Sequence, residues 1–230
     1  RLTSSGGGNI DVTTGAVTTA GTDSDALQLT TSGSGTVTAN GGILTTQGDF
    51  SFGLSIAGGT GAIGATIAGA STSGDTAYGV DITGSGPVTF HSTGTIATTG
   101  DNSKALQITS PGPITVNAGL FTTTGDSSVA FQIAGGSGAI NATIAGASTT
   151  GTGTGSDAVH IASTGPLTIV NTGSITTTGG FSDGIDIRMV TTANVTCGNI
   201  STATPTSVPV HILSNGNTTV TCGTVTGAAG

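Results

Sequence analysis

The feature that most constrains this chain is a short apolar motif that recurs along it with a period of about 26 residues, a length typical of repeat architectures. The motif reads small, apolar, polar, apolar, and its clearest copy is Ala105-Leu106-Gln107-Ile108. The first apolar residue of successive copies falls at positions 27, 54, 80, 106, 131, 159, 185 and 210, so the copies are almost evenly spaced. Such a repeat indicates a solenoid, in which each unit buries its apolar side chains by stacking on its neighbours.

A second apolar column repeats with the same period and indicates a second strand in each unit. Its members are Ile10, Val37, Ile63, Val88, Ile114, Ile140, Leu167, Val195 and Val220. A third run, of the kind Gly-Thr-Ile-x-Thr-Thr, lies between the two columns in most units. Alternation within a strand sends Leu106 and Ile108 inward and Gln107 outward. We expect Gly and Asp at the corners between runs to adopt the left-handed backbone of sharp bends.

These patterns predict an all-β fold, a single-stranded parallel β-helix (β-solenoid) of about nine coils, each of roughly 26 residues and three short strands. Nine coils that rise about 4.8 Å each form a rod about 40 Å long. The period never breaks, so residues 1–230 are expected to form one continuous solenoid, least regular between Thr191 and Pro209. Residues 56–74 and 133–151 are nearly identical and lie three repeats apart, which indicates duplication of a three-unit block.

Composition narrows the fold and the partners. All 11 acidic residues are aspartates, and Gly supplies 42 residues, so strands and turns are favoured over helices. A net charge of −8, with Arg1, Lys104 and Arg188 as the cationic side chains, argues against binding to nucleic acid or anionic membrane. No apolar run reaches the about 20 residues of a spanning helix, so we expect no membrane insertion of this segment. The chain begins with Arg and shows no signal peptide, so we expect a segment of a longer exported protein.

The repeats resemble those of a known class of surface proteins. The phrases NTGSITTTGGFSDGIDI (171–187) and STGTIATTGDNSKALQI (92–108) look like passenger repeats of bacterial autotransporter and haemagglutinin-like adhesins. The resemblance extends over almost the whole chain. It implies a right-handed β-helix that is exported to the cell surface, and the C-terminal membrane barrel usual in that family is absent from this sequence.

One outward column of the motif ends in residues with versatile chemistry. Stacking brings His160, Asp186 and His211 into a row with a spacing of about 4.8 Å. Such a row of imidazole, carboxylate and imidazole could bind a divalent metal or act as an acid and base. We interpret it instead as a solvated polar ladder, and we assign no catalytic residue, metal ligand or cofactor.

The two cysteines are candidates for a disulfide. Cys197 and Cys222 each lie two residues after an inward valine, so consecutive coils place their Cα atoms about 4.8 Å apart, within disulfide range. Because an exported protein meets an oxidising compartment, we favour the bond over two free thiols.

Two further columns have simpler explanations than ligand binding. Asp49, Asp75, Asp101 and Asp126 follow Gly at matching corners and could recruit calcium, but Asx-turn capping explains the pattern Gly-Asp-x-Ser. Outward Thr in runs such as Thr122-Thr123-Thr124 could match an ice lattice, but Thr is also an ordinary residue of solvated strands.

We therefore expect a non-catalytic extracellular rod on a microbial surface: a stalk, an adhesin passenger or a fibre-forming subunit. Exposed strand edges at the ends predict stacking on further coils or on other copies, and a host glycan or cell-surface receptor is the expected ligand class. The alternative is a carbohydrate-active β-helix enzyme that uses the row His160, Asp186 and His211. A weaker alternative is an ice-binding solenoid.

Overall fold

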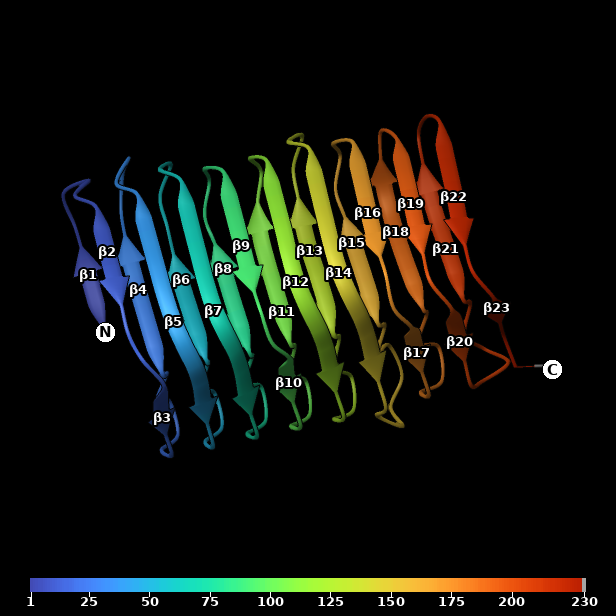
Figure 1. The fold of residues 1–230 in the computed structure, drawn as a ribbon, viewed down its shortest axis with the longest axis horizontal. Coiled ribbons are helices and arrows are strands. Elements are labelled where there is room, and N and C mark those ends of the chain that lie inside the picture. Colours follow the sequence, from blue (N-terminus) through green and yellow to red (C-terminus); the bar gives the residue numbers. More distant parts are fainter. Residues whose placement is uncertain (229–230) are drawn as a thin grey trace.

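The predicted all-β solenoid is confirmed. The computed structural model describes residues 1–228, and within that range the chain forms strands, turns and loops without any helix. Successive coils lie side by side along a rod, with the N-terminus at one end and the C-terminus near the other (Figure 1). All pairings between strands are parallel and join equivalent positions of successive repeats, as the period predicts. Within residues 1–228, no helix has the length and apolarity needed to cross a lipid bilayer.

The apolar motif forms a nine-stranded sheet with one strand from each coil. Its strands, in order along the rod, are β1 (Leu2–Ser4), β4 (Leu27–Thr31), β6 (Leu54–Ala57), β8 (Val80–Thr83), β11 (Leu106–Ser110), β13 (Phe131–Gly135), β15 (Val159–Ala162), β18 (Ile185–Val190) and β21 (Val210–Ser214). Both apolar residues of the motif are buried in each inner coil, as at Leu106 and Ile108, so this sheet forms one wall of the core.

The other two runs form a fourteen-stranded sheet, and here the prediction of three short strands per coil needs correction. In four coils the two runs are a single ten-residue strand: β5 (Val37–Thr46), β7 (Ile63–Thr72), β12 (Ile114–Thr123) and β14 (Ile140–Thr149). In the other five they are separate: β2 (Ile10–Thr13) and β3 (Val17–Thr19), β9 (Val88–Ser92) and β10 (Ile96–Thr98), β16 (Leu167–Asn171) and β17 (Ile175–Thr177), β19 (Ala193–Cys197) and β20 (Ile200–Thr202), β22 (Thr218–Cys222) and β23 (Val225–Thr226). The long strands persist because pairing to the next coil continues through the corner, for instance Gly41 with Ile67 and Ile43 with Gly69.

The register shows that the second apolar column was misaligned by two positions near its end. Leu167 pairs with Ala193, whereas Val195 pairs with Ile169 in the next inward column. Ala193 occupies the expected inward position and is 3% exposed. Because Ala is small and Val195 is larger and more apolar, the sequence pattern assigned Val195 to this column instead. The coils themselves remain in phase.

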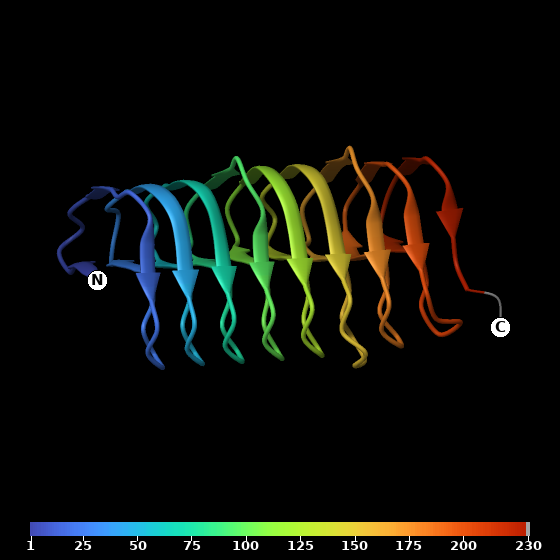
Figure 2. The ribbon, with the colours of Figure 1, turned by 60° about the horizontal axis from the view of Figure 1, so that its bottom comes forward.

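The prediction of left-handed Gly and Asp at corners is confirmed at Asp23, Gly33 and Gly155, but most glycines that open the turn between the third run and the next coil serve close packing instead. These turns project in a row from one edge of the rod (Figure 2). A Cβ on Gly100 would lie 1.9 Å from the carbonyl oxygen of Gly74, and the equivalent distance from Gly125 to Gly100 is 2.0 Å. In the four of these turns in which Asp follows the glycine, the left-handed residue is the second residue after the glycine: Phe50, Thr76, Asn102 and Ser127.

The same turns are joined across coils by side-chain hydrogen bonds. The backbone N–H of Asp101 donates to Asp75 Oδ1 at 2.8 Å, and the N–H of Asp126 donates to Asp101 Oδ1 at 2.8 Å. A second ladder is buried, with the N–H of Ser103 donating to Ser128 Oγ at 3.0 Å. The aspartates thus accept from the next coil and not within their own turn, which replaces the Asx-turn explanation.

The least regular position precedes the segment that we predicted. Strand β18 contains a β-bulge between Ile187 and Val190, and Met189 has a φ of 65°. From Ala193 onward the strands of that coil pair in regular register with the next coil. The bulge matters because it lies beside the candidate site.

Candidate functional site

The outer face of the nine-stranded sheet carries two neighbouring columns of polar and aromatic side chains. The first is the predicted row, in register from coil to coil: Gln28, Ser55, Asp81, Gln107, Gln132, His160, Asp186 and His211. The second lies three positions earlier in each coil: Asp25, Phe52, Tyr78, Lys104, Val129, Asp157, Asp183 and Val208. Sequence reasoning missed the second column, although its constant offset from the motif was visible.

The last coils bring five of these residues, with Arg188, into one charged cluster. His160 Nδ1 lies 2.9 Å from Asp186 Oδ2, and His211 Nδ1 lies 3.0 Å from Asp186 Oδ1. Arg188 Nε donates to Asp186 Oδ2 at 2.7 Å. Asp157 lies 3.3 Å from His160 Nδ1, and Asp183 lies 3.9 Å from His211 Nδ1. We name these six residues the Asp–His cluster.

Burial of Asp186 corrects the interpretation of the row as a solvated ladder. The row is formed as predicted, but Asp186 has no exposed surface, while the His160 side chain is 20% exposed and that of His211 is 39% exposed. A buried carboxylate is stable only when it is paired and hydrogen-bonded. Here both oxygens are paired: Oδ2 with Arg188 and His160, and Oδ1 with His211.

The electrostatics of the cluster differ on its two sides. The hydrogen bond with Asp157 and the charge of Asp186 raise the pKa of His160 above its ordinary value, and burial opposes this rise. Of the two carboxylates, Asp186 lies nearer to the imidazole. Burial raises the pKa of Asp183, and the negative charges of Asp157 and Asp186 add to this, whereas the backbone N–H of Val208 lowers it. The carboxylates of Asp157, Asp183 and Asp186 therefore lie close enough to disfavour one another's charged forms.

Local backbone structure places the members of the cluster. Asp157 and Asp183 are held by their Oδ1 atoms, which accept from the backbone N–H groups of Asp183 and Val208 at 2.7 and 2.8 Å. Each therefore directs Oδ2 toward an imidazole. Arg188 stands two positions after Asp186 on the same face, immediately before the bulge at Met189. Bulges commonly re-aim side chains at the edge of a site.

In the coils nearer the N-terminus, the side chains of the same face stack on one another and form hydrogen bonds with one another. The rings of Phe52 and Tyr78 stack with centroids 5.1 Å apart, and Lys104 Nζ lies 5.1 Å from the Tyr78 centroid. Lys104 also donates to Gln107, whose amide donates to Asp81 at 3.2 Å. Both faces of the Tyr78 ring are therefore occupied within the protein. This leaves no free face of Tyr78 on which a sugar ring could stack.

The two cysteines lie in register in adjacent strands and are bonded to each other. Strand β19 places Cys197 directly opposite Cys222 of β22, with the Cα atoms 4.4 Å apart. Cys197 is 6% exposed and belongs to the core. The disulfide closes one coil of the rod.

The turn aspartates and the outward threonines do not form binding arrays. Each turn carboxylate accepts from the next coil, and among residues 1–228 these aspartates form no group of three ligand atoms close enough to hold an ion. In the pairs Thr45-Thr46, Thr122-Thr123 and Thr176-Thr177 the second residue is buried and cannot present its hydroxyl to an ice surface. The outward column is chemically mixed, with Ala97, Thr122 and Ser148 in consecutive coils. Such a column is no regular threonine array.

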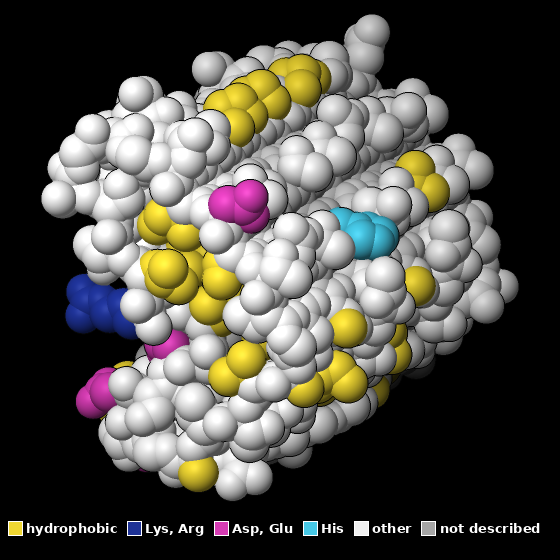
Figure 3. All heavy atoms as spheres, turned by 60° about the vertical axis from the view of Figure 1, so that its left-hand side comes forward, with side chains coloured by type: hydrophobic (Ala, Val, Ile, Leu, Met, Phe, Trp, Pro, Cys, Tyr) yellow, Lys and Arg dark blue, Asp and Glu magenta, His cyan; other side chains and the backbone are white. Residues whose placement is uncertain are grey.

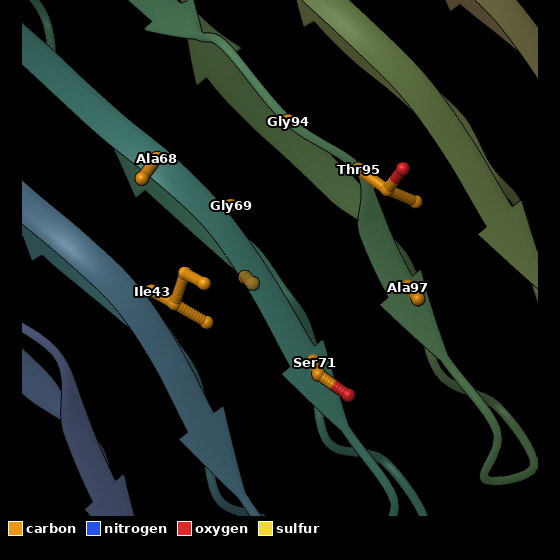
Figure 4. Close-up of a pocket in the computed structure, with 8 residues that line it drawn as sticks. Ile43, Ala68, Gly69, Ser71, Gly94, Thr95 and Ala97 are labelled. Carbon is orange, nitrogen blue, oxygen red and sulfur yellow. The ribbon is translucent and has the colours of Figure 1, made fainter.

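The rest of the surface is chemically plain. Figure 3 shows the N-terminal end and one flank, on which charged side chains are sparse and short apolar patches are scattered. A shallow hollow lies beside Ile43, which is 55% exposed, with Gly69 and Gly94 in its floor (Figure 4). It arises where small residues follow a large one along the rod. His91 is separate from the cluster and lies 2.9 Å from the carbonyl oxygen of Asn117.

Comparison of this chain with protein-family models, with curated proteins and with solved structures found no match.

Proposed function

We propose that this chain is a non-catalytic, rod-shaped segment with a structural or adhesive role outside the cell, and that it associates end to end. The observation that supports this best is the contrast between inner coils and the last coil. Val195 and Ile200 are 0% and 1% exposed, whereas their counterparts one coil later, Val220 and Val225, are 44% and 48% exposed. A further coil would cover these residues as each inner coil covers the one before it.

The disulfide supports the proposed location. Cys197 and Cys222 are bonded, and disulfides persist chiefly in oxidising environments such as the cell surface and the periplasm. If the role is adhesive, the rod binds a host glycan or a cell-surface receptor.

Sedimentation velocity over a range of concentrations tests end-to-end association. We expect the average mass of the wild type to rise with concentration and the double variant Val220→Lys/Val225→Lys to remain a monomer, because charges at the end oppose stacking. Ile43→Lys/Leu120→Lys places the same two charges on exposed residues at the side of the rod and is the matched control, which should associate as the wild type does. A wild type that stays monomeric up to its solubility limit would contradict the proposal.

A carbohydrate-active enzyme is the second candidate, and the hydrogen-bonded Asp186–His160 and Asp186–His211 pairs are the observation that favours it. A carboxylate that holds an imidazole is a common arrangement for a general base. A screen of glycans for binding and turnover distinguishes the two functions. Turnover that is lost in His160→Ala/Asp186→Ala would support the enzyme, and binding without turnover would support the adhesive rod.

A further inference from the structure

We propose that the Asp–His cluster contains a site for one divalent transition-metal ion, with Asp183, Asp186 and His211 as its ligands. This inference is independent of the proposed function, because it depends only on the outer face of β18 and β21 and on the residues that precede them. The three residues offer one nitrogen and two oxygen atoms that lie within 4.8 Å of one another.

The spacing of these atoms is close to that of a coordination shell. His211 Nδ1 lies 3.0 Å from Asp186 Oδ1 and 3.9 Å from Asp183. Ligands around a tetrahedral zinc ion with bonds of about 2.0–2.1 Å lie about 3.3 Å apart. Side-chain movements of less than about one ångström therefore bring all three atoms to bonding distance of a common ion.

The two carboxylate ligands are each oriented by a second contact on the oxygen that would not bind the ion. Asp186 has no exposed surface, and Arg188 holds its Oδ2 at 2.7 Å, so that Oδ1 faces His211. Asp183 Oδ1 accepts from the N–H of Val208 at 2.8 Å, which directs Oδ2 toward the same imidazole. Outer contacts of this kind set the orientation of metal ligands and raise affinity.

Charge and donor type indicate the class of ion. The carboxylates of Asp157, Asp183 and Asp186 and the guanidinium of Arg188 together carry a formal charge of −2 while both imidazoles are neutral, and a divalent cation neutralises it. Imidazole with carboxylate oxygens suits zinc and its neighbours, whereas calcium and magnesium prefer sites made of oxygen alone. The His211 side chain is 39% exposed, so an ion can enter from solvent and keep a water molecule as its fourth ligand.

The neighbouring group of Asp157, His160 and Asp186 has a similar composition but a different electrostatic setting. His160 Nδ1 and Arg188 Nε both contact Asp186 Oδ2, at 2.9 and 2.7 Å. An ion bound there would have to displace a permanent positive charge. This group therefore supplies an outer contact of Asp186 and not a second ion site.

Isothermal titration calorimetry of the untagged, metal-free chain with zinc chloride tests the proposal. We expect one zinc ion per chain, and we expect His211→Ala and Asp183→Asn each to weaken binding about 100-fold or more, because each removes a ligand. His91→Ala removes an imidazole outside the cluster and should bind as the wild type does to within about threefold, whereas His160→Ala removes an outer contact of Asp186 and should weaken binding about tenfold, less than His211→Ala does. Cobalt(II) should give the visible absorption of a tetrahedral or five-coordinate site in the wild type and not in His211→Ala.

Three results would overturn the proposal. The first is a wild type without saturable zinc binding, a measurement that no folding defect of a variant can obscure. The second is binding that His160→Ala or His91→Ala removes as fully as His211→Ala does. The third is equal competition by calcium at the same concentration. Circular dichroism of each variant, compared with that of the wild type, separates loss of a ligand from loss of the fold.

Discussion

The turns at one edge of the rod and the outer face of the nine-stranded sheet both carry aspartates, but Asp81 and Asp186 on the face are held by side chains and not by backbone N–H groups. In the turns, each carboxylate accepts a backbone N–H from the next coil, as Asp75 does from Asp101. Hydrogen bonds from Gly153 and Thr152 lower the pKa of the turn residue Asp126, whereas burial raises the pKa of Asp81 on the face. The turn aspartates stabilise the fold, whereas the face holds Asp81 at a cost, because burial disfavours its charged form.

This difference separates structural residues from candidate functional ones. A residue that repeats in every coil and bonds to the next coil belongs to the stacking of the solenoid. The Asp–His cluster breaks the repeat, since the equivalents of His160 and Asp186 in earlier coils are residues such as Gln28 and Ser55. A position that departs from its own column is therefore the better place to search for function in a repeat protein.

The largest effect is expected from the turn, in the variant Gly100→Ala. The added Cβ would lie 1.9 Å from the carbonyl oxygen of Gly74 and 2.8 Å from the backbone nitrogen of Asp75, and backbone atoms cannot move aside as the end of a flexible side chain can. We expect a loss of about 3 kcal/mol or more in the free energy of unfolding, at or above the upper end of overpacking effects. Urea denaturation followed by circular dichroism measures it.

Gly64→Ala is the control for that substitution. Only one atom, a backbone oxygen 3.9 Å away, lies near the position of the added Cβ. The duplicated segment carries Asn141 at the same place, so a side chain fits there. We expect a change within about 0.5 kcal/mol. Equal losses in both variants would show that strand glycines are as constrained as turn glycines and would remove the distinction.

The buried serine ladder provides the second test. Ser103 Oγ accepts from the N–H of Ala77 at 3.1 Å and donates to the carbonyl oxygen of Gly74 at 3.2 Å. Ser103→Ala leaves both groups buried without these partners, so we expect a loss of about 1–3 kcal/mol in unfolding free energy. Position 77 holds Ala where other coils hold Ser, and Ala77→Ser should stabilise the protein by completing the ladder. A stable Ser103→Ala would show that the ladder is incidental.

A smaller effect is expected at the buried threonines that precede the turn. Thr123 Oγ1 donates to the carbonyl oxygen of Ser128 at 3.1 Å, whereas Thr98 Oγ1 is buried without a hydrogen-bond partner. Thr123→Val should cost about 1 kcal/mol, and Thr98→Val should be neutral or stabilising, because it replaces an unpaired polar group by an apolar one of the same shape. Thermal unfolding of the two variants gives the difference, and a greater loss in Thr98→Val would contradict it.

Periodicity in the sequence was sufficient to predict the fold, because each coil repeats the same inward residues. Periodicity could not predict that β5 and β7 continue through their corners. In the sequence, Gly41 and Gly42 indicate a strand break, but pairing with the next coil keeps the strand intact. The misplaced column at Val195 has a similar origin, because Ala193 fills the inward position with too little apolar surface to mark it.

The candidate site was predictable in part. The repeat period alone places His160, Asp186 and His211 in one row, and the strand register confirms it. The cluster around Asp186 also contains residues outside the row: Asp157 and Asp183 from the preceding column, and Arg188 beside a bulge. A bulge is a single extra residue without a fixed sequence signature, so sequence reasoning predicted the row and missed the charged cluster around it.

The smallest predicted effect concerns Asp81 on the face. Burial raises its pKa, while the hydrogen bond from Gln107 and the charge of Lys104 oppose this. A carboxyl group whose folded pKa is raised binds more protons in the folded state, so its contribution to stability is present at low pH and is lost as the pH rises through that pKa. Asp81→Asn removes this loss and keeps an oxygen for Gln107, so we expect the variant to be more stable at pH 7 by about 0.5 kcal/mol and equal to the wild type near pH 3. Urea denaturation at both pH values measures the difference. A variant that is less stable at pH 7 would mean that Gln107 and Lys104 outweigh burial, and the face would then hold its carboxylates as favourably as the turns do.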